Sequence, residues 1–414
     1  MKNIQRATRA GAVAALMGLS LGGCADFLTV KNPNVIDASA IDPVNDAPTL
    51  AASAQQNFAV ALGWYAMYQS WFVGETLVAE TFPTRNEFGR RDVTNQNGSH
   101  NTDLWSPLSV ALASSATVLD LVLPNPTTNI NYARAAVFNG YSFVFMAESF
   151  CEGVSRGGPA LNTASMLDSA VASFQRAVSV GVANGTADGV ALANAARVGL
   201  ARAQLQAGRG AQAIAAAQAV PAGFVFNMRY LDDPAFRNRL GNRLWQFTFD
   251  RGSILVAPAF RVDDPRVPFK TPAQHRLVPF DAASGAFFIQ DKFPAFDSPI
   301  RLASKTEANY IEAEATGTAA QLALITARRA ANNQPVYTGA TTAAAVLTEL
   351  MEQKGREFYL EAKRMGDFRR IPAAVLNVPI PGGVFFKPAF EPIGNQVCWP
   401  LPIQETDNNQ NLRP

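Results

Sequence analysis

Histidine is scarce in this sequence: its 414 residues include only His100 and His275. Two isolated imidazole groups give no basis for a histidine-ligated metal or for a Ser-His-Asp triad. The chain also lacks a phosphate-binding loop, because its one glycine-rich candidate, residues 207–210, lies between predicted helices and not after a strand. We therefore expect no metal, no cofactor and no catalytic residue, and we predict that the protein is not an enzyme.

The sequence also lacks an excess of charge of either sign, with 35 basic and 33 acidic residues. Residues 1–23 carry three basic residues and no acidic one, so the rest of the chain has 32 basic (35 − 3) and 33 acidic residues. A chain so close to neutral gives no support for binding to nucleic acid or to another polyanion. After residue 23 it has no apolar run long enough to span a bilayer as a helix.

Cysteine is scarce too, and the first of the three cysteines has a specific context. A basic start is followed by a small, apolar stretch at residues 11–21 and then by Leu-Gly-Gly-Cys, which ends at Cys24. This order is typical of a lipoprotein signal peptide, in which the thiol of the new N-terminal cysteine receives a lipid. We expect residues 1–23 to be removed, Cys24 to carry the palmitate-containing anchor and residues 24–48 to form an extended tether. The alternative is an ordinary signal peptide with an incidental cysteine.

The two other cysteines are Cys151 and Cys398. An exported chain lies in an oxidising compartment, where disulfides form and persist. We therefore favour a disulfide between these two residues, and the alternative is two unrelated buried thiols.

Apolar residues at three- and four-residue steps predict a mainly helical chain from about residue 49. Between residues 132 and 220, small residues at helix crossings, glycine at a turn and proline after the last helix are typical of stacked helical hairpins. The polar residues 81–103 predict a surface loop. The predicted helices after the first are residues 105–123, 132–150, 167–180, 191–206, 211–219, 303–315 and 319–331.

Residues 221–299 have a different composition. Twelve of the 27 phenylalanines and nine of the 26 prolines lie between residues 221 and 300. Because proline interrupts helices, we expect irregular loops with a few short strands, one of them at residues 244–249. Loops of this length in a compact domain are usually functional.

Residues 343–371 form the longest strongly amphipathic segment, and we predict one helix that ends before Pro372. Its C-terminal part is dense in charge. Interleaved arginines favour permanently ionised carboxylates over acid–base catalysis, so we expect a structural ion network. The members of this network are Glu357, Glu361, Arg364, Asp367, Arg369 and Arg370.

Residues 357–370 resemble the "E-L-x-x-E-G-x-R-x-x-D-L-R-R-W" signature of the RagB/SusD family, with Ala362 where the family often has glycine and Ile371 where it often has tryptophan. Residues 353–354 are Gln-Lys where the family often has Glu-Arg. Three further stretches resemble family motifs in the expected order. They are the helix pair at residues 196–220, the helical segments at residues 303–331 with Arg328 and Arg329, and the closing Trp-Pro-Leu-Pro at residues 399–402, which is followed by Glu405, Asn408 and Asn409.

The resemblance implies a single SusD-like domain at residues 49–414, built on a tetratricopeptide-like scaffold. Its N-terminal half, about residues 49–220, carries the hairpins, and its C-terminal half covers about residues 221–414. The resemblance also implies a lipid-anchored outer-membrane protein at the cell surface that binds a nutrient, commonly an oligosaccharide, and delivers it to a TonB-dependent, SusC-like transporter. The alternatives are a lipid-anchored helical-repeat adaptor that binds only protein and, less favoured, a glycan-degrading enzyme.

Aromatic side chains are the candidates for a ligand site, because the apolar face of a sugar ring stacks on an aromatic ring and polar neighbours fix its hydroxyls. Most aromatics at helical spacing belong to a core, so each candidate has this alternative. Glu75 and Glu80 are also close enough in sequence for a glycosidase carboxylate pair, although solvated or capping carboxylates are the favoured interpretation. The aromatic candidates are Trp64, Tyr68, Trp71, Trp105 and Trp245.

Overall fold

The computed structural model describes residues 41–413. The predicted signal peptide, the predicted anchor Cys24 and most of the predicted tether lie outside the described residues. Residues Ala47–Pro414 form one compact unit. No helix within residues 41–413 is both long and apolar enough to cross a lipid bilayer.

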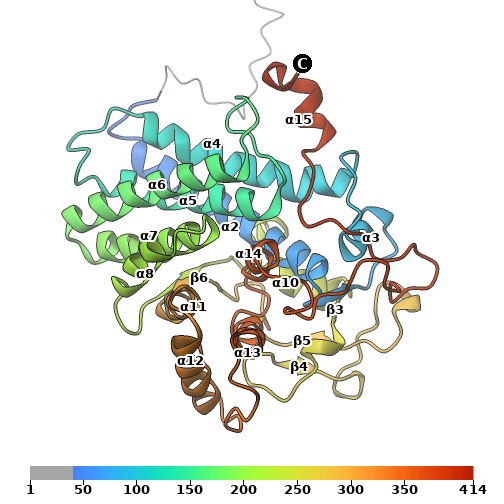
Figure 1. Cartoon of the computed structure of the whole chain (residues 1–414). Helices are drawn as coiled ribbons and strands as arrows, with labels where there is room; N and C mark the ends of the chain where they lie inside the picture. Colours follow the sequence, from blue (N-terminus) through green and yellow to red (C-terminus); the bar gives the residue numbers. More distant parts are fainter. Residues whose placement is uncertain (1–40, 414) are drawn as a thin grey trace, which may run out of the picture. The chain divides into compact units, whose positions relative to one another are not determined.

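The compact unit is mainly helical, as predicted (Figure 1). Its strands are short and pair as β1 with β3, β2 with β6, and β4 with β5, each pair antiparallel. The α-helices are α2 (Ala47–Phe72), α3 (Pro83–Arg90), α4 (Ser106–Asp120), α5 (Ile130–Ser149), α6 (Thr163–Asn184), α7 (Ala187–Gln206), α8 (Gly210–Gln218), α9 (Arg237–Leu240), α10 (Arg243–Trp245), α11 (Lys305–Thr316), α12 (Thr318–Ala331), α13 (Ala343–Glu357), α14 (Arg364–Arg370) and α15 (Ile403–Asn408). The strands are β1 (Thr76–Val78), β2 (Val225–Met228), β3 (Ile254–Val256), β4 (Phe269–Lys270), β5 (Ile289–Gln290) and β6 (Ile300–Ser304). Two π-helical turns, η2 (His100–Trp105) and η3 (Gln246–Asp250), precede α4 and follow α10.

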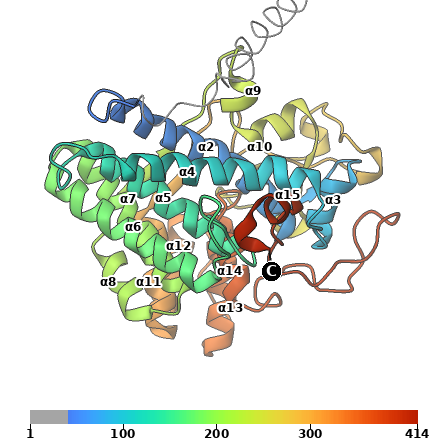
Figure 2. The ribbon, with the colours of Figure 1, turned by 90° about the horizontal axis from the view of Figure 1, so that it is seen from above.

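Consecutive helices pack side by side from α4 to α8, and the predicted hairpin array is present (Figures 1 and 2). The connections after α6 and α7 are short turns, and those after α4 and α5 are longer. The turn between α6 and α7 shows the local cause. Gly185 ends α6 with a φ of 72°, in the left-handed region that suits glycine. The Thr186 side chain then accepts the Gly189 backbone N–H at 3.1 Å and caps α7. The chain therefore reverses within two residues.

Phe174 of α6 fixes the spacing of three helices. A Cβ at Gly140 of α5 would lie 2.7 Å from this ring, and one at Gly199 of α7 would lie 2.3 Å from it. Both glycines are therefore needed for α5 and α7 to approach α6 this closely.

The hairpin array is interrupted after α8 and resumes at α11, which packs against α7 and α8. The proline- and phenylalanine-rich segment is inserted between these two helices. Its two ends are held together by the β2–β6 pair, and the Lys305 backbone N–H donates to the carbonyl of Phe224 at 2.8 Å. The irregular segment is therefore a long insertion that leaves and re-enters the array at one place.

Residues 343–371 do not form one helix. α13 ends at Glu357 and α14 begins at Arg364, and in the break Leu360 and Ala362 have φ values of 59° and 55°. Cations capture the carbonyls that a continuous helix would use internally. Arg301, Lys292 and Arg202 donate to the carbonyls of Glu357, Tyr359 and Ala362 at 2.7, 2.7 and 2.8 Å.

Two further local predictions are wrong. Residues 81–103 contain α3 and most of η2, and their polar residues Asn86, Asn97 and His100 are buried and hydrogen-bonded, so they are not a plain surface loop. Residues 244–249 form the end of α10 and most of η3 instead of a strand. The Asn242 side chain caps this turn by accepting the Trp245 backbone N–H at 3.1 Å, which favours the helical conformation.

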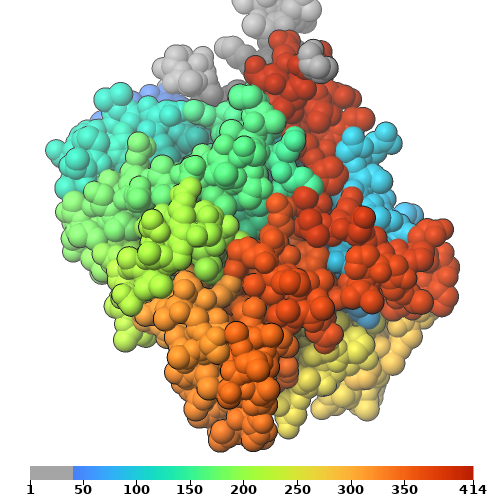
Figure 3. Space-filling model, in the orientation of Figure 1, coloured from blue at the N-terminus to red at the C-terminus, as the bar shows by residue number. Residues whose placement is uncertain are grey.

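The C-terminal segment crosses back over the N-terminal helices. Cys398 forms a disulfide with Cys151, just beyond the end of α5, which is the pairing favoured from the sequence. Trp399 is fully buried, and its backbone N–H donates to the carbonyl of Ser149 at 2.8 Å. In the space-filling view, the orange-to-red surface of the C-terminal part borders both the green hairpins and the yellow irregular segment (Figure 3).

Candidate functional site

A cavity of about 420 Å³ lies in the irregular segment, at the end of η3. Its size is in the range of small-molecule sites. Gly252 brings the two sides of this cavity together, because it has a φ of 70° and a Cβ at this position would lie 2.5 Å from the carbonyl oxygen of Val278. The Phe280 backbone N–H donates to the Gly252 carbonyl at 2.8 Å. The cavity is lined by Phe249, Asp250, Arg251, Gly252, Arg276, Leu277, Val278, Pro279 and Phe280.

Phe280 lines the cavity, and its ring packs against a second exposed phenylalanine ring, that of Phe82. Phe280 is 46% exposed and Phe82, which precedes α3, is 45% exposed, with their ring centroids 6.0 Å apart. The Arg251 guanidinium lies over both rings, 4.8 Å from the Phe280 centroid and 5.2 Å from that of Phe82. The two rings are tilted by 35° to each other, and with Arg251 they present apolar surface with a polar edge to solvent.

The Arg251 guanidinium forms an ion pair with Glu80, whose side chain is fully buried. The Glu80 carboxylate accepts from Arg251, from Arg85 and from the Ser253 hydroxyl, the last at 2.7 Å. With these partners Glu80 is a structural counter-ion that holds Arg251 at the cavity wall.

Glu75 does not join Glu80 at the cavity. Its carboxyl is buried, and burial raises its pKa to about 7 in spite of the nearby cations Arg364 and Lys292. Neither carboxylate lines the cavity. The structure therefore does not bring the two groups together as a glycosidase pair at this site.

Three of the predicted aromatic ligand residues are buried in the core, and the prediction is wrong for them. Tyr68, Trp71 and Trp105 are 0%, 2% and 4% exposed. The Tyr68 hydroxyl donates to Asp103, and the Trp105 indole donates to Glu405 at 3.1 Å. The reason is that α2 and η2 lie inside the unit, where aromatic rings at helical spacing fill the core and present no face to a ligand.

The other two predicted aromatics, Trp64 and Trp245, are half-buried. Trp64 packs edge-on against Phe247, and Arg243 lies 4.4 Å from its ring centroid. Trp245 stacks on Phe249, with ring centroids 5.7 Å apart. Because Phe249 lines the cavity, Trp245 supports the cavity wall, whereas Trp64 lies outside the lining.

The residues that sequence reasoning missed are Phe82, Phe249, Arg251 and Phe280. The phenylalanine-rich composition of residues 221–300 was a signal for Phe249 and Phe280, whereas Phe82 lies outside that segment. The polar groups of the cavity supply both kinds of hydrogen-bonding partner, since Arg251 and Arg276 donate and Asp250 accepts. Burial raises the pKa of Asp250 above its usual value, although Arg237 opposes this shift.

The charge cluster at residues 357–370 lies elsewhere and is buried. Glu361 accepts from Lys292 at 2.8 Å and from Arg301 at 2.9 Å, while Arg328 donates to Glu357 at 2.7 Å. Burial alone would raise the pKa of Glu361, but the two cations outweigh it and hold this pKa below its usual value.

A second part of the cluster is centred on Lys354, which contacts Asp367 at 2.6 Å and Glu314 at 3.3 Å. Arg370 donates to Asp367 at 2.8 Å and also to Glu314. Burial would raise the pKa of Glu314, but Lys354 and Arg370 lower it to about 2. Both carboxylates therefore have two cationic partners each.

Two of the predicted members of the network have no carboxylate partner within residues 41–413. Arg364 donates to the carbonyl of Leu376, and Arg369 donates to the carbonyl of Phe150 and to the Thr163 hydroxyl. The break after α13 turns these side chains toward free backbone oxygens. The prediction of ion pairs is therefore wrong for these two arginines.

No protein-family model and no curated protein matches the sequence. Solved structures do match. A laminarin-binding SusD-like protein superposes with a TM-score of 0.65 at 14% identity, covering 88% of this chain and 97% of that one. The surface glycan-binding protein A from Bacteroides fluxus gives 0.65 at 12% identity, covering 89% and 98%. A SusD superfamily protein from Bacteroides thetaiotaomicron gives 0.64 at 13% identity, again covering 89% and 98%.

These similarities extend over nearly the full length of each solved structure and over 88–89% of this chain. The sequence identities are low, so the similarity establishes the fold. The chain has the SusD fold, as the RagB/SusD resemblance of its sequence predicted.

Proposed function

We propose that this protein binds an oligosaccharide at the 420 Å³ cavity of the irregular segment. The observation that carries the proposal is the pair of exposed rings, Phe82 and Phe280, beside a cavity with charged side chains at its edge. Aromatic rings take the apolar face of a sugar, while Asp250 and Arg276 offer an acceptor and a donor to its hydroxyls. Two of the solved structures with this fold are described as a laminarin-binding protein and a surface glycan-binding protein.

The test is a glycan array followed by calorimetric titration of the best ligand on the chain from residue 25. Phe280→Ala and Phe82→Ala should each weaken binding by about 1 kcal/mol, roughly fivefold in Kd, because each removes an exposed stacking surface. Tyr337→Ala is the control, since it removes an aromatic ring that does not line the cavity. Unchanged affinity in both phenylalanine variants, each with a wild-type melting temperature, would show that the sugar binds elsewhere.

We also propose that Cys24 anchors the protein to the outer membrane through lipid. The support is the order of the basic, apolar and Leu-Gly-Gly-Cys segments at residues 1–24. Cys24→Ser should abolish palmitate labelling and release the protein from the membrane fraction or leave it unprocessed. Retention of both the label and the membrane location would contradict the anchor.

We further propose that the bound ligand passes to a TonB-dependent transporter of the SusC type, with the protein at the cell surface. The resemblance of the sequence motifs to the RagB/SusD family supports this step. Saccharide binding by the isolated protein would separate a receptor from an adaptor that binds only protein, and an assay for released sugars would detect an enzyme. Co-purification of a large outer-membrane partner with the anchored protein, absent with Cys24→Ser in the soluble fraction, is the expected result.

A further inference from the structure

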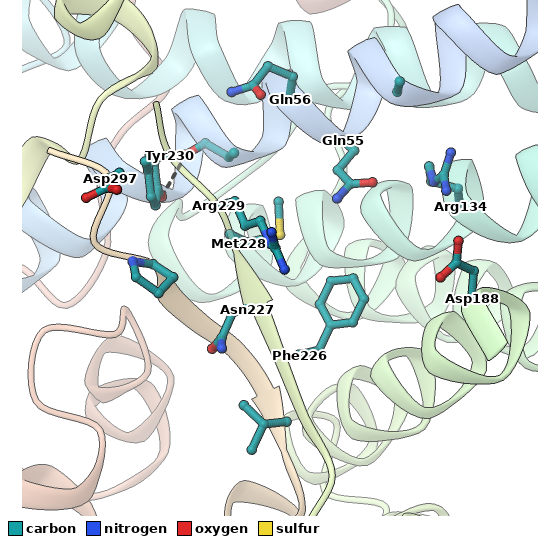
Figure 4. A pocket seen from close by; sticks show the side chains of 14 residues that line it. Gln55, Gln56, Arg134, Asp188, Phe226, Asn227, Met228, Arg229, Tyr230 and Asp297 are labelled. Atoms are coloured by element: carbon teal, nitrogen blue, oxygen red, sulfur yellow. Dashed lines mark hydrogen bonds between the residues drawn. The ribbon is translucent and has the colours of Figure 1, made fainter. Parts of the chain in front are cut away.

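A second and larger cavity, of about 910 Å³, lies between the hairpin array and the β2–β6 pair. Figure 4 shows four elements around it: α2 with Gln55, α5 with Arg134, α7 with Asp188, and β2 with Phe226. None of these residues lines the 420 Å³ cavity. The two cavities are therefore separate sites in the fold.

The polar side chains of this cavity are uncommitted. Within residues 41–413, seven of them have neither a hydrogen bond nor an ion pair with another residue. Gln55, Gln56 and Arg134 are half-buried, and the other four are exposed. One exception in the lining is the Tyr230 hydroxyl, which donates to the carbonyl of Ala59 at 3.0 Å. The seven uncommitted side chains are those of Gln55, Gln56, Arg134, Asp188, Asn227, Arg229 and Asp297.

Arg134 is the most informative of them. It lies in the first turn and a half of α5, it is half-buried, and its Nε atom is buried without an acceptor in the described part of the chain. The Nη atoms of Arg134 have no partner in the described part of the chain and are not buried, so they are open to a ligand in the cavity, whereas the buried Nε is not. A carboxylate suits this donor set best, because it accepts two parallel N–H bonds from the guanidinium fork.

Arg229 adds a second guanidinium on the opposite side. In Figure 4, Arg134 and Asp188 lie on one side of the open space, and Arg229 and Phe226 lie on the other. Asp297 lies at the far end, beside Tyr230. The lining therefore has two cations, two carboxylates and one aromatic ring, and its two guanidinium groups suit a ligand that carries a carboxylate beside an apolar face.

We propose that this cavity is a second binding site, for a small molecule that carries a carboxylate. Arg134 and Arg229 bind the carboxylate, the ring of Phe226 covers one face of the ligand, and Asp188 and Gln55 accept from its hydroxyl or amide groups. The site is independent of the carbohydrate site proposed above, since the two share no lining residue. Such a carboxylate is present on acidic sugars and on acylated amino acids, and these two sources are separated experimentally.

The test uses three probes on the chain from residue 25: glucuronate, its neutral amide glucuronamide, and N-acetylglycine, which has a carboxylate and no sugar ring. Saturation-transfer NMR and calorimetric titration measure binding. Glucuronate should bind roughly tenfold or more tightly than glucuronamide, because the amide loses the charged hydrogen bonds. Binding of N-acetylglycine as well would assign the site to carboxylates in general, and its failure to bind would assign it to acidic sugars.

The variants locate the site. Arg134→Gln and Arg229→Gln should each weaken glucuronate binding roughly tenfold or more. Arg229 is exposed, so its variant tests the site even if Arg134→Gln does not fold. Arg209→Gln is the matched control, since Arg209 is partly exposed, pairs with Asp168 and does not line the cavity. Phe280→Ala should leave glucuronate binding unchanged, whatever it does to a neutral glycan.

Three results would overturn the proposal. They are equal binding of glucuronate and glucuronamide, wild-type affinity in the folded Arg229→Gln variant, and no binding of either carboxylate at millimolar concentration.

Discussion

At the scale of single residues, the hairpin array depends on two glycines, Gly140 and Gly199, at which a side chain would not fit. The Phe174 ring contacts α5 and α7 at Gly140 and Gly199, and neither helix has room for a methyl group there. Glycine inside a helix costs stability relative to alanine, so its presence at these two positions is explained by packing. The sequence alone showed small residues at helix crossings but not which ring they face.

This packing predicts opposite effects for two glycine-to-alanine changes. Gly199→Ala should lower the free energy of unfolding by about 1–3 kcal/mol, because the new methyl group overpacks against Phe174. Gly210→Ala, at the start of α8, should be neutral or stabilising by up to about 1 kcal/mol, since the nearest atoms to its Cβ are 3.9 Å away. Urea unfolding of the two variants measures both. Equal effects in the two variants would contradict the close approach of α6 and α7.

Glu75 is a second residue whose position predicts a measurable effect. Burial raises the pKa of its carboxyl from 4.5 to about 7, so the folded protein holds this proton more tightly than the unfolded chain does. The contribution of this group to stability is therefore fully present below about pH 4.5 and is lost as the pH rises through about 7. The loss is roughly 3 kcal/mol for a shift of this size.

Glu75→Gln should remove that decline, because an amide does not titrate. We expect the difference in free energy of unfolding between pH 5 and pH 8 to be smaller in Glu75→Gln than in the wild type, as measured by urea unfolding at both pH values. Glu391→Gln is the control, since Glu391 is exposed and its removal should leave the pH dependence unchanged. Identical pH dependence in Glu75→Gln and the wild type would contradict the raised pKa.

At the scale of elements, the structure differs most from the sequence prediction at the break between α13 and α14. The apolar period runs through residues 343–371, and Leu350, Phe358 and Met365 are all buried as that period predicts. The break arises from partners that are distant in sequence. Lys292, Arg301 and Arg202 capture three backbone carbonyls in it, and no local pattern contains that information.

Ala362 lies in this break and has a left-handed backbone conformation, with a φ of 55°. The left-handed region costs an L-residue roughly 1–2 kcal/mol, which explains why the RagB/SusD signature often has glycine at this position. We expect Ala362→Gly to change the free energy of unfolding by less than about 0.5 kcal/mol, because relief of strain offsets the lost methyl group and the added flexibility. Ala362→Val should destabilise strongly, since a β-branched residue is a poor fit to this conformation.

Ala201→Gly is the matched control for this element. Ala201 is equally buried but lies within α7, so the same substitution should cost about 1 kcal/mol or more there. Chemical denaturation of the three variants decides the matter. A similar loss in Ala362→Gly and Ala201→Gly would contradict the left-handed backbone at Ala362.

The helices were predictable wherever local signals decided them. The apolar period and the turn glycines placed α4 to α8 within a few residues, because each hairpin buries its apolar faces against its sequence neighbours.

The site was less predictable. Phe82 and Phe280 are 198 residues apart in the sequence (280 − 82). They meet because β1 pairs with β3 of the inserted segment and the Asp281 backbone N–H donates to the Ala79 carbonyl at 3.0 Å. Tyr68 and Trp71 of α2, which the sequence predicted as ligand residues, instead fill the core.

At the scale of the whole molecule, the C-terminal segment joins regions that are far apart in the sequence. The Trp399 ring lies among Tyr65 and Phe72 of α2, Phe88 of α3 and Phe150. These are aromatic contacts between the start of the compact unit and its end. The segment therefore closes the packing of α2, α3 and α5 around one buried indole.

The disulfide between Cys151 and Cys398 strengthens this closure, because it links residues 247 positions apart. A crosslink that closes so long a loop restricts the unfolded chain, and its loss costs about 2–5 kcal/mol. The double variant Cys151→Ser, Cys398→Ser should therefore unfold at lower urea concentration than the wild type. It should still fold, since the Ser149–Trp399 and Cys151–Trp399 backbone hydrogen bonds, at 2.8 and 2.9 Å, and the buried indole remain.

Two measurements check this prediction on the chain from residue 25, which lacks the acylated cysteine. Thiol titration of the unfolded, unreduced protein should find no reactive thiol, and two reactive thiols would exclude the bond. Reduction of the wild type should then lower its unfolding midpoint to that of the double variant, while the double variant itself should not respond to reductant. Because the crosslink acts through the unfolded chain, both proteins should bind glycan with the same affinity under native conditions. A large loss of glycan affinity in the folded double variant would instead show that the C-terminal segment positions Phe82 and the α3 side of the cavity.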